Sequence, residues 1–299
     1  MTRTITYTIP QNFNGRSIEN YLRTLGYSHA VLVLLKKTPD SVLLNGKWEY
    51  LRALVHTDDT LIITIREPDA ALPANHALLP LSVCYEDEDI LVIDKPAGLP
   101  IHPSRENHTH TLANAVSAHC DEEEHSFVFR CINRLDRDTT GLTIIAKNML
   151  SAAVLGRQAA LREINREYLS IAAGNVPDSG IINAPIARIF EHEMMRQVDF
   201  VRGEPAVTEY RRLAYHDGLS LVSLHLLTGR THQIRVHMKH LGYPLIGDFL
   251  YHPDYKKIER QALHSYRLQF IHPLSHTAMD LTAPLPPDMA CLFPDFPSF

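Results

Sequence analysis

The sequence predicts an α+β fold divided into a small amino-terminal domain and a larger domain that follows it. Some segments repeat apolar residues at helical spacing, whereas others are short apolar or alternating runs typical of strands. The predicted strands are joined by turns as often as by helices, which favours a largely antiparallel or mixed sheet. A stretch rich in Pro and Ala then indicates an extended linker. We therefore expect a domain over 1–66, a linker over 67–80 and a domain over 81–299.

The small domain is predicted to contain two short helices followed by a small sheet. The first helix is indicated by apolar residues at helical spacing, namely Ile18, Tyr21, Leu22 and Leu25. Ser28 can cap a second helix that ends in Lys36 and Lys37. The segment "SVLLNGKW" predicts a strand with an Asn45-Gly46 turn, and "DDTLIITI" predicts another strand.

The larger domain alternates predicted strands and helices. An apolar strand over Ile90–Ile93 ends at Lys95-Pro96, and the segments that predict further strands are "TGLTIIAKN", "EYLSIAAG", "LSLVSLHLLTG", "SYRLQFIHP" and "AMDLTAPL". One predicted helix carries Leu150, Val154, Leu161 and Ile164 on one face. A second predicted helix, "THQIRVHMKHLG", is closed by Gly242.

Composition narrows the classes of function. The chain has 299 residues, 45% hydrophobic and 21% charged, with a net charge of −5, which argues against coating nucleic acid by bulk positive charge. A local basic groove remains compatible with this charge. The first residues lack the apolar core of a signal peptide, and no run reaches the roughly 18 apolar residues of a membrane helix. We therefore expect a cytoplasmic protein with no membrane partner.

Neither metal nor cofactor binding is indicated. The four cysteines form no Cys-x-x-Cys pair, and the sequence has no glycine-rich phosphate-binding loop. Four histidines cluster, but two of them, His232 and His237, would lie about 140° apart on a helix, a poor geometry for sharing a metal. Packing, helix-end hydrogen bonds or phosphate contacts by the face with Arg235, Lys239 and His240 are the favoured roles.

The most charged turn is "INRLDRDTTGL", residues 132–142, which holds two arginines and two aspartates. A solvated turn with weak surface ion pairs would explain most such clusters. Here, however, the turn is one of six blocks in a fixed order: "EDEDILVIDKPAGLPIHPS", "INRLDRDTTGLTIIAKN", "REYLSIAAG", "LLTGRTHQIRVHMKHLGYPLIGDFLY", "QALHSYRLQFIHP" and "LTAPLPPDM". Together these blocks resemble the RluA/RluD family of RNA pseudouridine synthases.

The resemblance implies a pseudouridine synthase catalytic fold and a cofactor-free reaction, in which the N1–C1′ bond of a chosen uridine is cleaved and the base is rejoined through C5. It assigns catalysis to Asp136, Tyr168 and Arg230. It also makes Arg134 the residue that enters the RNA in place of the flipped base.

These residue types suit the chemistry. A carboxylate beside the sugar can stabilise charge at C1′, bond to C1′ or remove a C2′ proton, and the sequence leaves these routes open. A guanidinium such as that of Arg230 next to Asp136 would lower the pKa of the carboxyl group. Tyr168 offers a ring for stacking on uracil and a hydroxyl near C5.

Two positions depart from the family pattern. Asn133 stands where His is common, and Arg166 stands where Lys is common, which leaves the subfamily and the target uridine open.

The small domain resembles, over about residues 12–66, the αL-type RNA-binding domain of a ribosomal small-subunit protein. This resemblance makes Lys36 and Lys37 RNA contacts, although two lysines at a helix end also complement the helix dipole.

We expect an RNA partner, large-subunit ribosomal RNA ahead of transfer RNA, and a monomeric enzyme. Two other classes of function remain. A non-catalytic RNA-binding protein could retain the fold, and an N-glycosidase could use the same carboxylate chemistry but would release free uracil.

Overall fold

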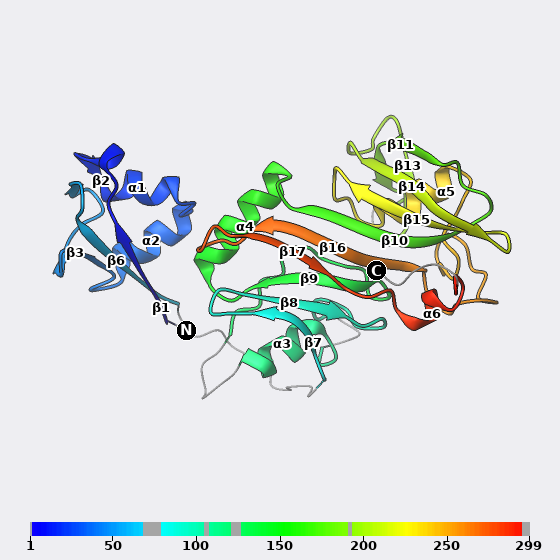
Figure 1. Ribbon diagram of the computed structural model, residues 1–299, viewed down its shortest axis with the longest axis horizontal. Helices are drawn as coiled ribbons and strands as arrows, with labels where there is room; N and C mark the ends of the chain where they lie inside the picture. Colours follow the sequence, from blue (N-terminus) through cyan, green and yellow to red (C-terminus); the bar gives the residue numbers. More distant parts are fainter. Residues whose placement is uncertain (1, 68–78, 105–107, 121–126, 191–192, 295–299) are drawn as a thin grey trace.

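The computed structural model describes residues 2–67, 79–104, 108–120, 127–190 and 193–294. It has a small domain at one end and a larger domain built on a long curved sheet (Figure 1). Residues 68–78 of the predicted linker lie outside the described part of the chain.

The small domain combines a four-stranded sheet with two helices. The strands lie in the order β1-β6-β3-β4, and β2 pairs separately with β5. Ser17 caps α1 and Ser28 caps α2, as each hydroxyl accepts a hydrogen bond from a backbone N–H three residues on. The bounds are β1 Thr2–Thr8, a 3-10 turn Gln11–Phe13, β2 Arg16–Ser17, α1 Ile18–Thr24, α2 His29–Lys37, β3 Val42–Leu44, β4 Lys47–Trp48, β5 Leu54–Val55 and β6 Thr60–Arg66.

The two predicted helices and the Asn45-Gly46 turn are confirmed, but the predicted order of elements is wrong. A strand, β1, precedes the helices and pairs antiparallel with β6 along its whole length, from Thr2 opposite Arg66 to Thr8 opposite Thr60. The sequence alternation at residues 2–8 therefore belongs to a strand whose partner lies more than fifty residues later.

The small domain contacts the larger domain through α4 and the neighbouring loops. Leu150 of α4 is buried in the core of the small domain. Gly26, at φ +90°, lies so close to Val154 that a Cβ at this position would come within 2.8 Å of a Val154 methyl carbon. Arg3 donates from Nε and Nη2 to both oxygens of the buried Asp89, at 2.8 and 2.9 Å. Apolar and ionic contacts thus join the two domains.

The larger domain is built on a nine-stranded sheet in the order β11-β14-β15-β10-β16-β9-β8-β7, with β17 paired to β16. Among the described strands of this sheet, only the β9–β16 pair is parallel, so the predicted mixed, largely antiparallel sheet is confirmed. The strand bounds are β7 Ser82–Glu86, β8 Ile90–Lys95, β9 Thr140–Ala146, β10 Asn165–Ala173, β11 Ser179–Asn183, β14 Val207–His216, β15 Leu219–Leu226, β16 Leu263–Ile271 and β17 Ala278–Thr282, and a separate hairpin joins β12 Ile186–Arg188 to β13 Arg196–Val198.

Four helices are described in this domain: α3 Leu112–Cys120, α4 Met149–Leu161, α5 Gln233–His240 and α6 Pro287–Ala290. The predicted helix over 150–164 is too long, because α4 ends at Arg162 in the left-handed conformation and Ile164 is buried beyond it. The expected closure of α5 at Gly242 is confirmed, since this glycine has φ +91°. No helix in the described residues is long and apolar enough to cross a membrane.

The centre of the sheet depends on one glycine. Gly141 has φ +105°, and a Cβ at this position would lie 2.3 Å from the carbonyl oxygen of Ser265. Gly141 pairs with Ser265 in the parallel β9–β16 contact, so only a residue without a side chain fits there. The Thr-Thr-Gly that looks like a turn in the sequence is therefore the start of β9, and the charged turn before it is tied to the middle of the sheet.

Candidate active site

The charged turn before β9 is held in place by Asn133. The buried Asn133 amide donates from Nδ2 to the carbonyl of Leu142 at 3.0 Å, and its Oδ1 accepts from the backbone N–H of Ile144 at 2.8 Å. Asn133 therefore uses a donor and an acceptor to fasten the turn to β9. Asn133, which stands where His is common in the family, thus has a structural role here.

Lys95 also anchors this turn. Its Nζ donates to the carbonyl oxygens of Pro96, Leu99 and Arg137 at 2.8, 3.0 and 2.8 Å, and the side chain is fully buried. Burial lowers the pKa of Lys95 to about 7, opposed by the nearby carboxylates of Asp138 and Asp136. The three carbonyls match the three hydrogens of an ammonium group and fix the backbone next to Asp136.

A cavity of about 560 Å³ lies beside the charged turn. It is bounded by the charged turn, by β10 and by the segment that leads into α5. The predicted residues Asp136, Tyr168, Arg230 and Arg134 all line it, and Arg166 does so as well. Residues separated by about a hundred positions in the sequence thus surround one space, which is of the size that accommodates a small ligand.

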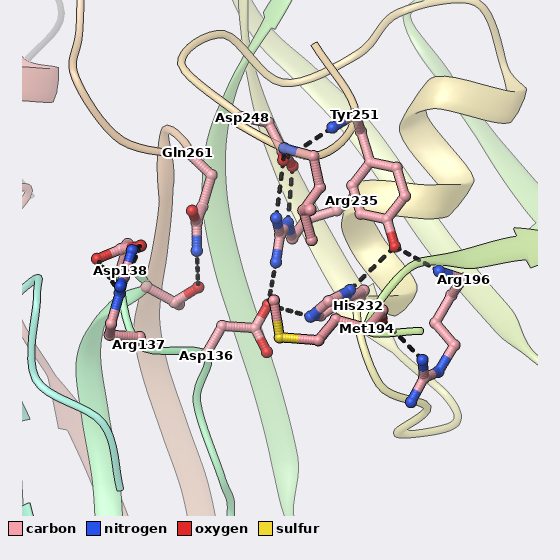
Figure 2. Close-up of polar contacts among 12 residues, drawn as sticks. Asp136, Arg137, Asp138, Met194, Arg196, His232, Arg235, Asp248, Tyr251 and Gln261 are labelled. Atoms are coloured by element: carbon pink, nitrogen blue, oxygen red, sulfur yellow. Dashed lines mark hydrogen bonds and ion pairs between the residues drawn. The ribbon is translucent and has the colours of Figure 1, made fainter. Parts of the chain in front are cut away.

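Arg235, rather than Arg230, lies next to Asp136. Arg235 Nη1 donates to Asp136 Oδ2 at 2.8 Å, while its Nε and Nη2 donate to the two oxygens of Asp248, each at 2.7 Å (Figure 2). Arg230 instead forms an ion pair with Glu204 and donates to the carbonyl of Pro205 at 3.2 Å. The prediction that the guanidinium of Arg230 flanks Asp136 is therefore wrong.

The assignment of Arg235 to an RNA-facing surface is also wrong. Its side chain is 2% exposed and that of Asp248 is 0% exposed. Burial disfavours the charge on Arg235, but hydrogen bonds and charge attraction from Asp248 and Asp136 outweigh this and raise its pKa above the ordinary value. The guanidinium thus stays cationic and joins two carboxylates.

A sequence signal for Arg235 exists. It lies between two apolar residues, Ile234 and Val236, in the middle of a predicted helix. In the structure both neighbours are buried, so the arginine between them is buried as well. A buried guanidinium needs a buried anion, and Asp248, in the apolar segment "LIGDFLY", is that anion.

Tyr168 lies in the middle of β10, opposite Leu224 of β15 and Ser265 of β16. It is buried, and burial raises the pKa of its phenol above the ordinary value, with the positive charge of Arg166 opposing the shift. Tyr168 therefore presents a neutral ring to the cavity.

The remaining predicted RNA contacts are on the surface. Arg134, Lys37 and Lys239 are exposed, and Lys36 is exposed but paired with Glu19 at 3.0 Å. Lys239 lies over the ring of Tyr251, 5.6 Å from its centroid. Arg137 pairs with the neighbouring Asp138 at 2.9 Å within the charged turn.

The clustered histidines have separate environments. His237 is buried and bonded to Thr208 and the carbonyl of Ala184, while His225 faces Glu209. Within the described residues, the group with metal-ligand atom types is Asp87, Asp89 and His272, at the contact between the domains. Its Asp89 carboxylate already accepts hydrogen bonds from Arg3 and Asn148.

Comparisons with known proteins identify the family to which this chain belongs. Residues 89–240 match the family model described as RNA pseudouridylate synthase. The chain belongs to this family. The synthase is 38% identical over 243 residues to the uncharacterized RNA pseudouridine synthase YhcT of Bacillus subtilis, covering 79% of this chain and 78% of that protein.

Two further relatives support the same conclusion. The ribosomal large subunit pseudouridine synthase D of Zymomonas mobilis is 40% identical over 229 residues, which are 72% of each chain. The solved structure of human RNA pseudouridylate synthase domain containing 1 aligns with a TM-score of 0.59 at 25% identity, over 75% of this chain and 90% of that one. The protein is thus an enzyme, an RNA pseudouridine synthase of α+β fold, and the predicted resemblance to the RluA/RluD family is confirmed.

Proposed function

We propose that this synthase isomerises a specific uridine of large-subunit ribosomal RNA, with Asp136 as the residue that acts on the sugar. The choice of RNA is supported by relatives named ribosomal large subunit pseudouridine synthase D in Zymomonas mobilis, Nitrosomonas europaea and Salmonella typhimurium, at 39–40% identity. The choice of residue rests on one observation, the bond from buried Arg235 to Asp136 Oδ2.

The two oxygens of Asp136 have different surroundings. Oδ2 accepts the hydrogen bond from Arg235, whereas within the described residues no hydrogen bond reaches Oδ1. The charge-assisted hydrogen bond from Arg235 fixes the direction of the carboxylate. Oδ1 is then the oxygen free to stabilise charge at C1′, to bond to C1′ or to accept a proton from C2′.

Tyr168 is assigned to holding the base. Its raised pKa keeps the phenol protonated at neutral pH, which makes it a weak base but a good aromatic surface. Uracil stacked on this ring would keep its reacting carbons beside Asp136 while the base turns. The role of Tyr168 is therefore to retain and orient the base between bond cleavage and bond formation.

Arginines surround the cavity. Arg134 is exposed at its edge and belongs to the turn that carries Asp136, so it can occupy the space of a flipped uridine. Arg166 and Arg230 also line the cavity, and their positive charges suit the phosphates on either side of the flipped nucleotide.

The small domain provides two kinds of RNA contact in this proposal. Lys37, at the end of α2, is exposed and offers a phosphate contact, whereas Lys36 is already paired with Glu19. Trp48 and Tyr50 are exposed with ring centroids 4.4 Å apart, and Arg52 lies over the Tyr50 ring at 5.1 Å. Such aromatic residues beside a guanidinium suit stacking on unpaired bases.

We further propose that the synthase acts as a monomer in the cytoplasm. Light scattering of the purified protein alone and with RNA would measure the oligomeric state directly. The location is supported by the bacterial ribosomal relatives.

Mapping of pseudouridines in total RNA tests the proposal. Cells lacking the gene should lose a pseudouridine in large-subunit ribosomal RNA, the parent gene should restore it, and Asp136→Asn should not. Loss confined to transfer RNA would refute the choice of RNA. Restoration of the modification by Asp136→Asn would refute the catalytic assignment.

A further inference from the structure

His232 has an unusual backbone for its position. It is the residue before the first turn of α5, with φ 58° and ψ 19°, the left-handed region that residues with a side chain seldom adopt. Residues at this helix boundary usually accept a hydrogen bond from the first turn, yet the His232 side chain makes no such bond. A strained residue that does not serve its own helix suggests that its side chain is needed elsewhere.

The imidazole lies between Tyr251 and Asp136 (Figure 2). Nδ1 is 2.9 Å from the hydroxyl of Tyr251, and Nε2 is 3.8 Å from Asp136 Oδ2. The ring is mostly buried and meets the Tyr251 ring edge to face. His232 therefore faces the same carboxylate oxygen that Arg235 holds.

The contacts of the two imidazole nitrogens, with Tyr251 and with Asp136, bear on which nitrogen carries the proton. The hydroxyl accepts from the backbone N–H of Arg196 at 2.8 Å, and within the described residues its other partner is His232 Nδ1. The hydroxyl hydrogen can be donated to Nδ1, and the Asp136 carboxylate that faces Nε2 favours the neutral tautomer with its proton on Nε2.

The surroundings favour the neutral ring. Burial lowers the pKa of His232, Asp136 and Asp248 oppose this shift, and the positive charges of Arg235 and Arg196 reinforce it. A neutral imidazole with its N–H toward Asp136 is thus the expected form at neutral pH.

We propose that His232 is a positioning residue for Asp136: its Nε2–H and the Arg235 guanidinium together hold Oδ2, so that Oδ1 faces the sugar. The inference rests on the proposed catalytic role of Asp136. The two atoms are 3.8 Å apart in the free protein, and the proposal requires this separation to shorten to a hydrogen bond when RNA binds, as contacts in free active sites commonly do. Two donors on one oxygen define the rotation of the carboxylate about its Cβ–Cγ bond, which a single donor leaves partly free.

Two substitutions separate this role from a structural one. Asn tolerates the left-handed backbone well and can still contact Tyr251, but its amide is too short to reach Asp136. Gln retains the reach of Nε2 with a neutral N–H donor, but it is no better suited to the backbone than His. If only the backbone conformation at this position mattered, His232→Asn should be the more active variant. If contact with Asp136 matters, His232→Gln should be the more active one.

The experiment measures tritium release from [5-³H]uridine-labelled total RNA of cells lacking the gene, together with the melting temperature of each variant. We expect His232→Asn to lower kcat by about 10- to 100-fold with KM within about threefold. His232→Gln should retain most of the parent kcat, even if it melts at a lower temperature than His232→Asn.

A parent-like kcat for His232→Asn, or kcat values that follow the melting temperatures, would overturn the proposal. Asp136→Asn is measured in parallel. If it is inactive while both His232 variants match the parent, the role of His232 alone is refuted. Turnover by Asp136→Asn would refute the role of Asp136 and that of His232 with it.

Discussion

Replacing Arg235 and Arg230 separately by Lys tests whether the buried arginine or the one at the edge of the cavity supports catalysis. Lys at 235 keeps the charge but cannot bridge Asp136 and Asp248, so two of the three charge-assisted hydrogen bonds are lost. Each such bond contributes about 1.5–3 kcal/mol, so the loss of two of them beside the buried Asp248 should reduce the free energy of unfolding by about 3–6 kcal/mol. Loss of the single bond to Asp136 should lower kcat by about 10- to 150-fold.

Arg230→Lys is the matched control. Arg230 is 40% exposed and its partner Glu204 is 67% exposed, so this ion pair contributes at most about 1 kcal/mol. Its turnover should stay within about threefold of the parent. Urea unfolding and tritium release on the same preparations measure both quantities. If Arg230→Lys lost more turnover than a folded Arg235→Lys, the pairing of Asp136 with Arg235 would not be the interaction that supports catalysis.

Three further predictions concern other parts of the synthase. Arg134→Ala should weaken turnover on structured RNA by at least about tenfold yet leave a short unstructured RNA nearly unaffected, because only base flipping is impaired; equal losses on both RNAs would contradict this. Lys37→Gln should reduce the slope of log K for RNA binding against log salt concentration by the amount of about one phosphate contact. Trp48→Ala should weaken RNA binding by about 1–3 kcal/mol and leave this slope unchanged. Filter binding over a salt series measures both quantities. Burial lowers the pKa of His264 to about 4 in the folded protein. Between about pH 6.5 and pH 4 the unfolded chain therefore binds a proton at His264 that the folded protein does not bind. The free energy of unfolding should fall by about 3 kcal/mol over this range as the pH is lowered. Urea unfolding of His264→Gln near pH 7 and pH 4.5 should show a smaller loss than the parent, and an equal loss would exclude His264 as its source.

The small domain shows how local and distant interactions differ in predictability. Both helices begin at a serine that caps them, and the Asn45-Gly46 turn joins two short strands, because these features depend on residues within one turn of each other. Strand β1 was not predicted as part of the sheet, because its partner β6 lies at the far end of the domain. The contact of this domain with α4 depends likewise on surfaces that no local pattern describes.

The sequence by itself determined the type of fold, the family and the turn that carries Asp136. It did so because the order of the motifs and the residues within each turn are properties of the linear chain. The resemblance also placed an arginine beside Asp136, but it named Arg230 for that position.

Only the tertiary structure decided that this arginine is Arg235. Arg230 and Arg235 are five residues apart, and either could be matched to the carboxylate by type alone. The choice depends on the direction in which α5 presents each side chain and on the buried carboxylate of Asp248, which a separate loop brings to the site. A buried charge is stable only where a distant segment supplies its counterion, and such a pairing becomes visible only when the chain has folded.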